Sequence, residues 1–262
     1  MKKLFGLEGS TNVVLPSVTM SEHDRVRYLH LGSIWVQGAM SLDDPKRIEL
    51  EYVRRMMAWM LWRPSEHLCE GHAVQLGLGA GAITRFTRGV MKMRTTAVEI
   101  NPQVIAANRA WFRLPRDDAK LAVVFADARN WVDDDANTAS ADVLCVDLYD
   151  HDAARPVLDD DAFYAACHRV LNPDGGVMSV NLFGRKSSFA ASARRIAAAF
   201  GLDQVWKLEP TREGNTVVVA GHGVVVPDRD TLEARAATIE RSYGLPASRW
   251  LHMVRPLRLE KP

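Results

Sequence analysis

The sequence lacks several features that would place it in a specialised class of protein. Its three cysteines, Cys69, Cys145 and Cys167, show no paired spacing, which excludes a disulfide framework and favours reduced thiols in a reducing, cytoplasmic compartment. The formal net charge is only +1, so no global excess of charge points to nucleic acid or to an anionic membrane as a partner. No run approaches the ~20 apolar residues that span a bilayer, and the N-terminus has no apolar signal-peptide core.

Metal-binding patterns and repeats are also missing. His72, His168 and His222 are dispersed and form no ligand spacing, so no metal is expected. The chain shows no internal repeat and no low-complexity tract. Its 262 residues, 47% of them apolar, suit one large globular domain, with or without a small appendage.

From residue 72 onward, apolar segments with strand character alternate with helical patterns. Near-continuous apolar strands separated by helices indicate a parallel sheet covered on both faces. The last two strands have no helix between them, which predicts an antiparallel hairpin at one edge. The expected fold is therefore α/β: a seven-stranded, Rossmann-like sheet of the class I S-adenosylmethionine-dependent type. The predicted strands are HAVQLGL, RTTAVEI, LAVVFAD, DVLCVDLY, GVMSVNLF, DQVWKLE and NTVVVAGHG.

The chain divides into three predicted parts. Residues 1–45 form an N-terminal β arm, with a weakly ordered lead-in over 1–20 and a hairpin or meander over 24–40. Residues 46–230 form the Rossmann-like adenosyl-binding domain, and residues 231–262 a single helix and a tail.

The helix that opens the predicted large domain carries an apolar stripe. Asp43-Asp44-Pro45 provides an N-cap and a proline, and an apolar stripe follows at helical spacing: Ile48, Tyr52, Met56, Trp59 and Met60. We expect this stripe to be core.

Three alternating glycines, Gly77, Gly79 and Gly81, end the first strand of the large domain in VQLGLGAGAITRF and begin a helix. At such a turn, backbone N–H groups and the helix N-terminus can face a ligand with no Cβ in the way. Position 82 is alanine, so the dinucleotide pattern G-x-G-x-x-G is absent, and an adenosyl-type nucleoside is favoured over NAD.

Acidic residues end the next two strands. Glu99 is placed to bind ribose hydroxyls, because a carboxylate suits a vicinal diol. Asp127 is placed to accept a hydrogen bond from an adenine amine, with the small Ala128 leaving room for the ring. For both acids the alternative is a purely structural role as a helix cap.

The fourth strand of the alternating region ends at Asp147, and Asp150 follows in the loop. Two carboxylates at the mouth of a parallel sheet suit a cationic substrate, and one could accept a proton from an attacking amine. The alternatives are that Asp147 caps a turn and that Asp150 belongs to a solvated acidic loop. His151 lies beside them and could titrate near neutrality.

Taken in order, these motifs resemble the spermidine synthase (polyamine aminopropyltransferase) family from about residue 27 to 220. That family combines a Gln on an N-terminal β-domain with a GGGDGG loop, a VEID strand end, a GD(A/G) segment, a D-S-S-D-P loop and an F-Y helix. The corresponding segments are Gln37 in IWVQGAM, GLGAGA at 77–82, VEIN at 98–101, ADAR at 126–129, DLYD at 147–150 and FYAACHRVLNPDGG at 163–176.

The resemblance implies a decarboxylated S-adenosylmethionine donor, a small-molecule amine acceptor that is a diamine, and commonly a homodimer or a higher assembly. It implies that Asp147 is the catalytic base or amine anchor, and that Gln37, Tyr52 and Asp150 surround the acceptor. The chain departs from the family at Ala80, which replaces an aspartate, and at Val53, which replaces a histidine. These departures keep S-adenosylmethionine open as the donor, and with it a small-molecule methyltransferase. A non-catalytic nucleoside-binding relative also remains open.

Overall fold

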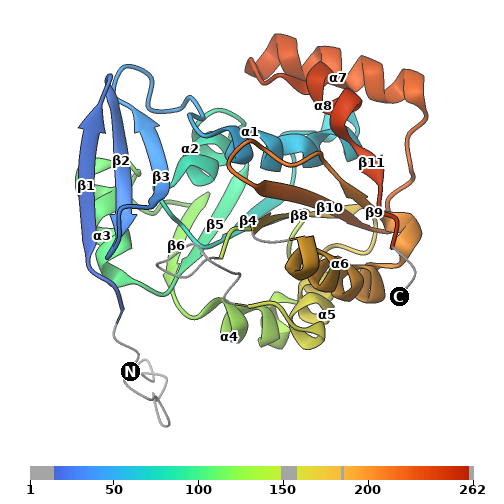
Figure 1. The fold of residues 1–262 in the computed structure, drawn as a ribbon, viewed down its shortest axis with the longest axis horizontal. Coiled ribbons are helices and arrows are strands. Elements are labelled where there is room, and N and C mark those ends of the chain that lie inside the picture. The colour runs from blue at the N-terminus through green and yellow to red at the C-terminus, as the bar shows by residue number, and fades with distance from the viewer. Residues whose placement is uncertain (1–14, 149–157, 184–185, 260–262) are drawn as a thin grey trace.

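Two β-sheets form the framework of the protein. The computed structural model describes residues 15–148, 158–183 and 186–259 (Figure 1). A small antiparallel sheet contains β1 (Val18–His23), β2 (Val26–Leu31) and β3 (Val36–Ser41). A large sheet of eight strands forms the centre of the molecule.

The large sheet has the spatial order β11-β9-β10-β8-β7-β4-β5-β6. Its strands β6, β5, β4, β7 and β8 run parallel, whereas β10 pairs antiparallel with both β8 and β9. The predicted parallel sheet with an antiparallel hairpin is confirmed, and β11 adds a two-residue edge to the seven expected strands. The strands are β4 (His72–Leu76), β5 (Arg94–Glu99), β6 (Leu121–Phe125), β7 (Val143–Val146), β8 (Gly176–Phe183), β9 (Val205–Lys207), β10 (Asn215–His222) and β11 (Arg255–Pro256).

Helices cover both faces of the large sheet (Figure 1). In β7, Val143 and Cys145 belong to the apolar cluster on one face, and Leu144 and Val146 to the cluster on the other. Burial on both faces explains why the strands are nearly continuous apolar runs. One face carries α1 (Glu51–Met56), α2 (Ala82–Gly89), α3 (Pro102–Trp111), α7 (Arg229–Tyr243) and α8 (Ala247–Met253), and the other carries α4 (Ala128–Asp133), α5 (Asp161–Val170) and α6 (Lys186–Phe200).

The small sheet begins earlier than the sequence indicates. β1 starts at Val18, inside the expected lead-in over 1–20, and pairs along its whole length with β2. The turn between the two strands holds Asp24 and Arg25 at φ values of 48° and 62°. Because this turn has neither the glycine nor the asparagine that usually marks such a conformation, its signal in the sequence is weak. The three strands form a meander.

The helix expected directly after Asp43-Asp44-Pro45 begins only at Glu51. Asp44 closes a turn instead: its carboxylate accepts a hydrogen bond from the Lys46 amide at 3.2 Å, and its carbonyl accepts one from the Arg47 amide at 3.0 Å. Local turn formation therefore outcompetes the predicted N-cap.

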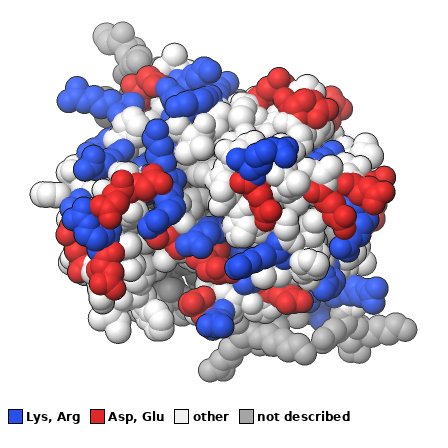
Figure 2. Space-filling view, turned by 90° about the horizontal axis from the view of Figure 1, so that it is seen from above, with Lys and Arg blue, Asp and Glu red and all other residues white. Residues whose placement is uncertain are grey.

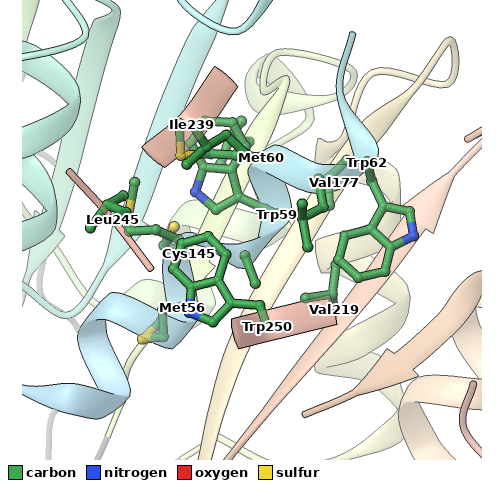
Figure 3. Packing of buried hydrophobic residues seen from close by; sticks show 14 of the residues in the cluster. Met56, Trp59, Met60, Trp62, Cys145, Val177, Val219, Ile239, Leu245 and Trp250 are labelled. Carbon is green, nitrogen blue, oxygen red and sulfur yellow. The ribbon is translucent and has the colours of Figure 1, made fainter. Parts of the chain in front are cut away.

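The apolar segment that follows α1 lies entirely in the core. It continues as a 3₁₀ helix, Met57–Trp62, in which every residue is buried. Trp59 and Met60 lie close to Ile239 of α7 and Trp250 of α8 (Figure 3). A helical segment that is apolar on all sides is stable only when it is enclosed, so the expectation of a core role agrees with the structure.

The C-terminal part contains more structure than the single helix expected from the sequence. α7 is capped by Asp228, whose carboxylate accepts a hydrogen bond from the Thr231 amide at 2.8 Å, and it ends at Gly244 with φ 66°. α8 and β11 follow. A helix as short as α8 gives too little periodicity to be recognised from the pattern. Within the described ranges, no helix combines the length and apolarity needed to cross a membrane.

Replacing Trp250 with alanine tests this C-terminal packing. Trp250 is 1% exposed, so Trp250→Ala should lower the free energy of unfolding by about 3–5 kcal/mol through lost apolar contacts and a residual cavity. Urea denaturation measures the change. The control is Trp111→Ala at a tryptophan that is 50% exposed, where a loss below about 1 kcal/mol is expected. If the two variants lost the same free energy of unfolding, the result would contradict the burial of Trp250 in the core.

Candidate active site

The glycine loop between β4 and α2 is held in place by close backbone contacts. Gly77 has φ 84°, and a Cβ at this position would lie 2.2 Å from the carbonyl oxygen of Asp147. Gly79 has φ 50°, and a Cβ there would lie 2.8 Å from the carbonyl oxygen of Gln37. Side chains at these positions would clash with backbone, so the loop requires glycine. Gly81, at φ 69°, is the N-cap of α2.

Glu99 lies at the carboxyl end of β5 with its side chain turned toward the glycine loop. Its Oε2 accepts a hydrogen bond from the Leu78 amide at 2.9 Å, and its Oε1 accepts one from the Asn101 amide at 2.8 Å. Burial raises the pKa of the Glu99 carboxyl, and the backbone donors partly oppose that rise. Glu99 therefore orders the loop while also lining the neighbouring cleft.

Asp127 caps a helix and also lies in the lining of the cleft. Its carboxylate caps α4 by accepting a hydrogen bond from the Arg129 amide at 2.6 Å, and the residue also lines the cleft. Ala128 is buried beside it and lines the same cleft. The helix cap fixes the orientation of the carboxylate, so the structural role and a ligand role are compatible.

Asp147 follows β7 directly and lies at the centre of the site. Tyr52 of α1 donates its hydroxyl to Asp147 Oδ2 at 3.2 Å, and Asn181 of β8 donates its amide Nδ2 to Oδ1 at 2.9 Å. Burial raises the pKa of the Asp147 carboxyl, and these two donors partly oppose the rise. A carboxyl with a raised pKa is a stronger base than an ordinary aspartate and suits proton abstraction.

Two asparagines that were not predicted from the sequence as site residues, Asn181 and Asn215, extend this hydrogen-bonded group. Asn215, the first residue of β10, donates its Nδ2 to Asn181 Oδ1 at 3.1 Å, which leaves Asn181 Nδ2 directed at Asp147. The available signal was a polar residue inside the apolar strand GVMSVNLF. A buried amide in such a strand needs partners, and here the partners are functional candidates.

β3 brings Gln37 to the same site by packing tightly on the glycine loop. A Cβ at Gly38 would lie 2.5 Å from the Ala80 amide nitrogen and 2.6 Å from Ala80 Cβ. Between β3, Tyr52 and Asp147 lies a small cavity of about 20 Å³. The buried Nε2 of Gln37 has no hydrogen-bond partner among the described residues. Buried polar atoms rarely lack a partner, and a ligand in the cleft could supply one to this atom.

These side chains line one cleft of about 1070 Å³ at the carboxyl ends of the parallel strands. Among the described residues that line it, six are carboxylates and none is lysine or arginine. The predicted site residues Asp150 and His151 lie outside the described residues. The acidic residues of the cleft are Glu49, Glu51, Glu99, Asp127, Asp147 and Glu213.

Metal and thiol chemistry have little support in the described part of the chain. It contains no group of three or more His, Cys, Asp or Glu side chains that could hold a metal ion. Cys145 and Cys167 are free and buried, and burial raises the pKa of Cys145 to about 12, so its thiol is protonated at neutral pH.

A pair of glycine substitutions tests the close approach at the loop. Gly77→Ala should lower the free energy of unfolding by about 1–3 kcal/mol, because it combines a positive φ with a backbone clash. Gly89→Ala, at the end of α2, meets only the Lys46 side chain at 3.6 Å and should raise stability by up to about 1 kcal/mol. Thermal denaturation would show the opposite signs, and a neutral Gly77→Ala variant would contradict the contact.

Comparison with known proteins places this arrangement in a family. No family model matches the chain. The polyamine aminopropyltransferase of Neisseria meningitidis serogroup A is 32% identical over 90% of this chain and 88% of the relative. That of Chromobacterium violaceum is 33% identical over 88% of this chain and 86% of the relative.

The fold has a counterpart among solved structures. A probable spermidine synthase from Corynebacterium glutamicum matches with a TM-score of 0.69 and 21% identity, covering 87% of this chain and 85% of that chain. This likeness concerns the fold, whereas the relatives above share sequence along nearly the whole chain. The chain belongs to the polyamine aminopropyltransferase family.

Proposed function

We propose that the protein transfers the aminopropyl group of decarboxylated S-adenosylmethionine to a small amine. The observation that carries this proposal is the charge of the cleft: six carboxylates and no lysine or arginine among its described lining residues. S-adenosylmethionine would bring a carboxylate into this field without a cation to pair it. The decarboxylated donor and an amine acceptor are cations, which the same field attracts.

The acidic charge of the cleft outweighs the effect of Ala80 on the choice of donor. Because position 80 is alanine instead of aspartate, a donor that carries a carboxylate is repelled less. For this reason the sequence leaves S-adenosylmethionine possible as the donor. The cleft nevertheless retains Asp147 beside Ala80, and both line the small cavity next to Gln37. A donor carboxylate in the cleft beside this cavity would face the Asp147 carboxylate, whereas a donor ammonium would be attracted to it.

The adenosyl half of the donor fits the end of the cleft near β5 and β6. Glu99 would accept hydrogen bonds from the ribose hydroxyls, and Asp127 from the adenine amine beside Ala128. The glycine loop, at Gly77, Gly79 and Gly81, would let the donor approach the backbone. In each case the side chain or backbone is already fixed by the contacts described above, so little ordering is required when the donor binds.

The reaction is a displacement at the carbon next to the sulfonium. The acceptor nitrogen forms a bond to this carbon, the carbon–sulfur bond breaks, and its electron pair stays on sulfur, which leaves neutral methylthioadenosine. The attacking amine needs a free lone pair, so one of its protons passes to Asp147. Tyr52 and Asn181 orient this carboxylate, and Gln37 would bind the donor or the acceptor with its unpaired amide.

A panel of donors tests this proposal. With putrescine as acceptor, the decarboxylated donor should yield methylthioadenosine and an aminopropylated amine, whereas S-adenosylmethionine should yield neither. Mass spectrometry of the products and calorimetry of donor binding measure the two steps. Tight binding of S-adenosylmethionine with release of S-adenosylhomocysteine would establish a methyltransferase instead. No binding of either donor or of methylthioadenosine would exclude both the aminopropyl transfer and the methyl transfer.

The pH profile tests the role of Asn181. Asn181→Leu removes a donor that lowers the pKa of Asp147, so that pKa should rise further. Because the base acts in its deprotonated form, the acid limb of kcat/KM should shift to higher pH. At neutral pH, kcat/KM should fall about tenfold or more, as expected for a lost hydrogen bond to a charged group.

Two further variants control this experiment. Ser179→Ala changes a buried side chain two residues away on β8 that has no hydrogen-bond partner among the described residues, and it should leave the pH profile unchanged. Asp147→Asn should abolish turnover and keep donor binding. An acid limb that does not move in Asn181→Leu would exclude Asn181 as a positioning residue.

A further inference from the structure

The glycine loop needs partners elsewhere in the chain to keep one conformation. Gly77, Gly79 and Gly81 all have positive φ, and glycine exchanges between several backbone conformations at little cost in energy. A loop with three such residues is therefore flexible unless other groups hold it. In this protein, side chains hold it by binding the carbonyl oxygens of residues 77–80.

Two buried amide side chains bind the first three of these carbonyl oxygens. Gln75 donates its Nε2 to the Gly77 carbonyl at 2.6 Å and to the Leu78 carbonyl at 3.2 Å. Asn108 of α3 donates its Nδ2 to the Gly79 carbonyl at 2.7 Å. Asn108 is fully buried and does not line the cleft, so the carbonyl that it binds is directed away from the cleft.

Arg85 of α2 binds the fourth carbonyl and joins the loop to two other segments. Its Nη1 donates to the Ala80 carbonyl, and also to the Phe112 carbonyl at the end of α3 at 3.0 Å. Its Nε donates to the Pro45 carbonyl, between β3 and α1, at 2.7 Å. The guanidinium is planar and holds its donors in a fixed fork, so these hydrogen bonds fix the three segments relative to one another.

Arg85 differs from the surface arginines of the protein. Figure 2 shows one face on which Lys and Arg side chains lie at the surface among Asp and Glu side chains, whereas Arg85 is only 4% exposed. Burial lowers the pKa of its guanidinium to about 10, so the group is still a cation at neutral pH. Among the described residues, no Asp or Glu pairs with it. A buried cation of this kind carries a desolvation cost, which its charge-assisted hydrogen bonds to carbonyl oxygens offset.

We propose that Arg85 is a positioning residue that holds the glycine loop in the conformation to which the adenosyl donor binds. This inference rests on the proposed aminopropyl transfer. Arg85 lines neither the cleft nor the small cavity, so it acts through the Ala80 carbonyl instead of touching the donor. Without this hydrogen bond the peptide between Ala80 and Gly81 can rotate, because glycine permits the change, and the carbonyl oxygen can turn into the space through which the donor approaches the loop.

Arg85→Met tests this role, because methionine occupies the space of the arginine stem and offers no hydrogen-bond donor. Binding of methylthioadenosine, measured by calorimetry, should weaken about tenfold, as expected for lost hydrogen bonds from a charged group. In turnover, the KM for the decarboxylated donor should rise by a similar factor, whereas the KM for the amine and the acid limb of the pH profile should stay unchanged. A loss of folded protein alone would lower the number of binding sites and leave the dissociation constant unchanged.

Two further variants complete the experiment. Arg85→Lys keeps the charge and loses the planar fork, so it should weaken methylthioadenosine binding by a smaller factor, about threefold. Arg88→Met is the matched control. Arg88 lies on the same helix and pairs with Asp118 at 2.6 Å, away from the glycine loop, so this variant should keep the wild-type dissociation constant.

The outcomes separate this inference from the proposed function. An unchanged dissociation constant in Arg85→Met, or in Arg85→Lys if the methionine variant does not fold, would overturn the role of Arg85 and leave the proposed function intact. An equal rise in Arg88→Met would lead to the same conclusion. Wild-type protein that does not bind methylthioadenosine would overturn the proposed function and this inference together.

Discussion

The contact between Gly77 and Asp147 is the constraint on which the site depends. Two hydrogen bonds continue the pairing of β4 with its neighbouring strands and so fix Gly77 and Asp147 beside each other. The Gly77 amide donates to the Val98 carbonyl of β5 at 2.9 Å, and the Asp147 amide donates to the Leu76 carbonyl of β4 at 3.0 Å. The glycine loop and the Asp147 carboxylate, which we propose to be the base, are therefore positioned by the backbone of neighbouring strands. Such placement is rigid, which suits a displacement reaction whose rate depends on alignment.

The electrostatics of the cleft follow from this convergence. Parallel strands end at one edge of the sheet, so Glu99, Asp127 and Asp147 are brought together there. Burial raises the pKa of both Glu99 and Asp147, which means that the folded protein carries these negative charges at a cost. A cationic ligand reduces that cost. Substrate binding and the stability of the fold are thus linked.

Much of this arrangement could be predicted from the sequence because it depends on strand ends. Apolar strands followed by glycine or by a carboxylate locate Gly77, Glu99, Asp127 and Asp147 at the same edge, and the family resemblance is confirmed by the relatives. The contribution of Asn181 could not be predicted in this way. It depends on the parallel register between β7 and β8, in which Val146 pairs with Val180, and no short-range pattern encodes that register.

Competition between alternative local structures explains the other differences between the predicted and the observed helices and strands. The turn at Asp44 and the β1–β2 turn at Asp24-Arg25 rest on hydrogen bonds and on backbone conformations that these residue types adopt only in particular contexts. The α8 helix is stabilised by burial of Trp250 in a core assembled from distant segments. Tertiary packing determines where these helices and strands begin and end, so secondary-structure propensity alone predicts the wrong boundaries.

The packing of Gly38 on Ala80 has a consequence for how this protein could change. A Cβ at position 38 would lie 2.6 Å from Ala80 Cβ and 2.5 Å from the Ala80 amide nitrogen, so any side chain at position 38 would push β3 away from the glycine loop. Glycine at position 38 is therefore a condition for bringing Gln37 to the cleft. A substitution there would act on the glycine loop through the N-terminal sheet, although residue 38 lies about forty positions before that loop in the chain.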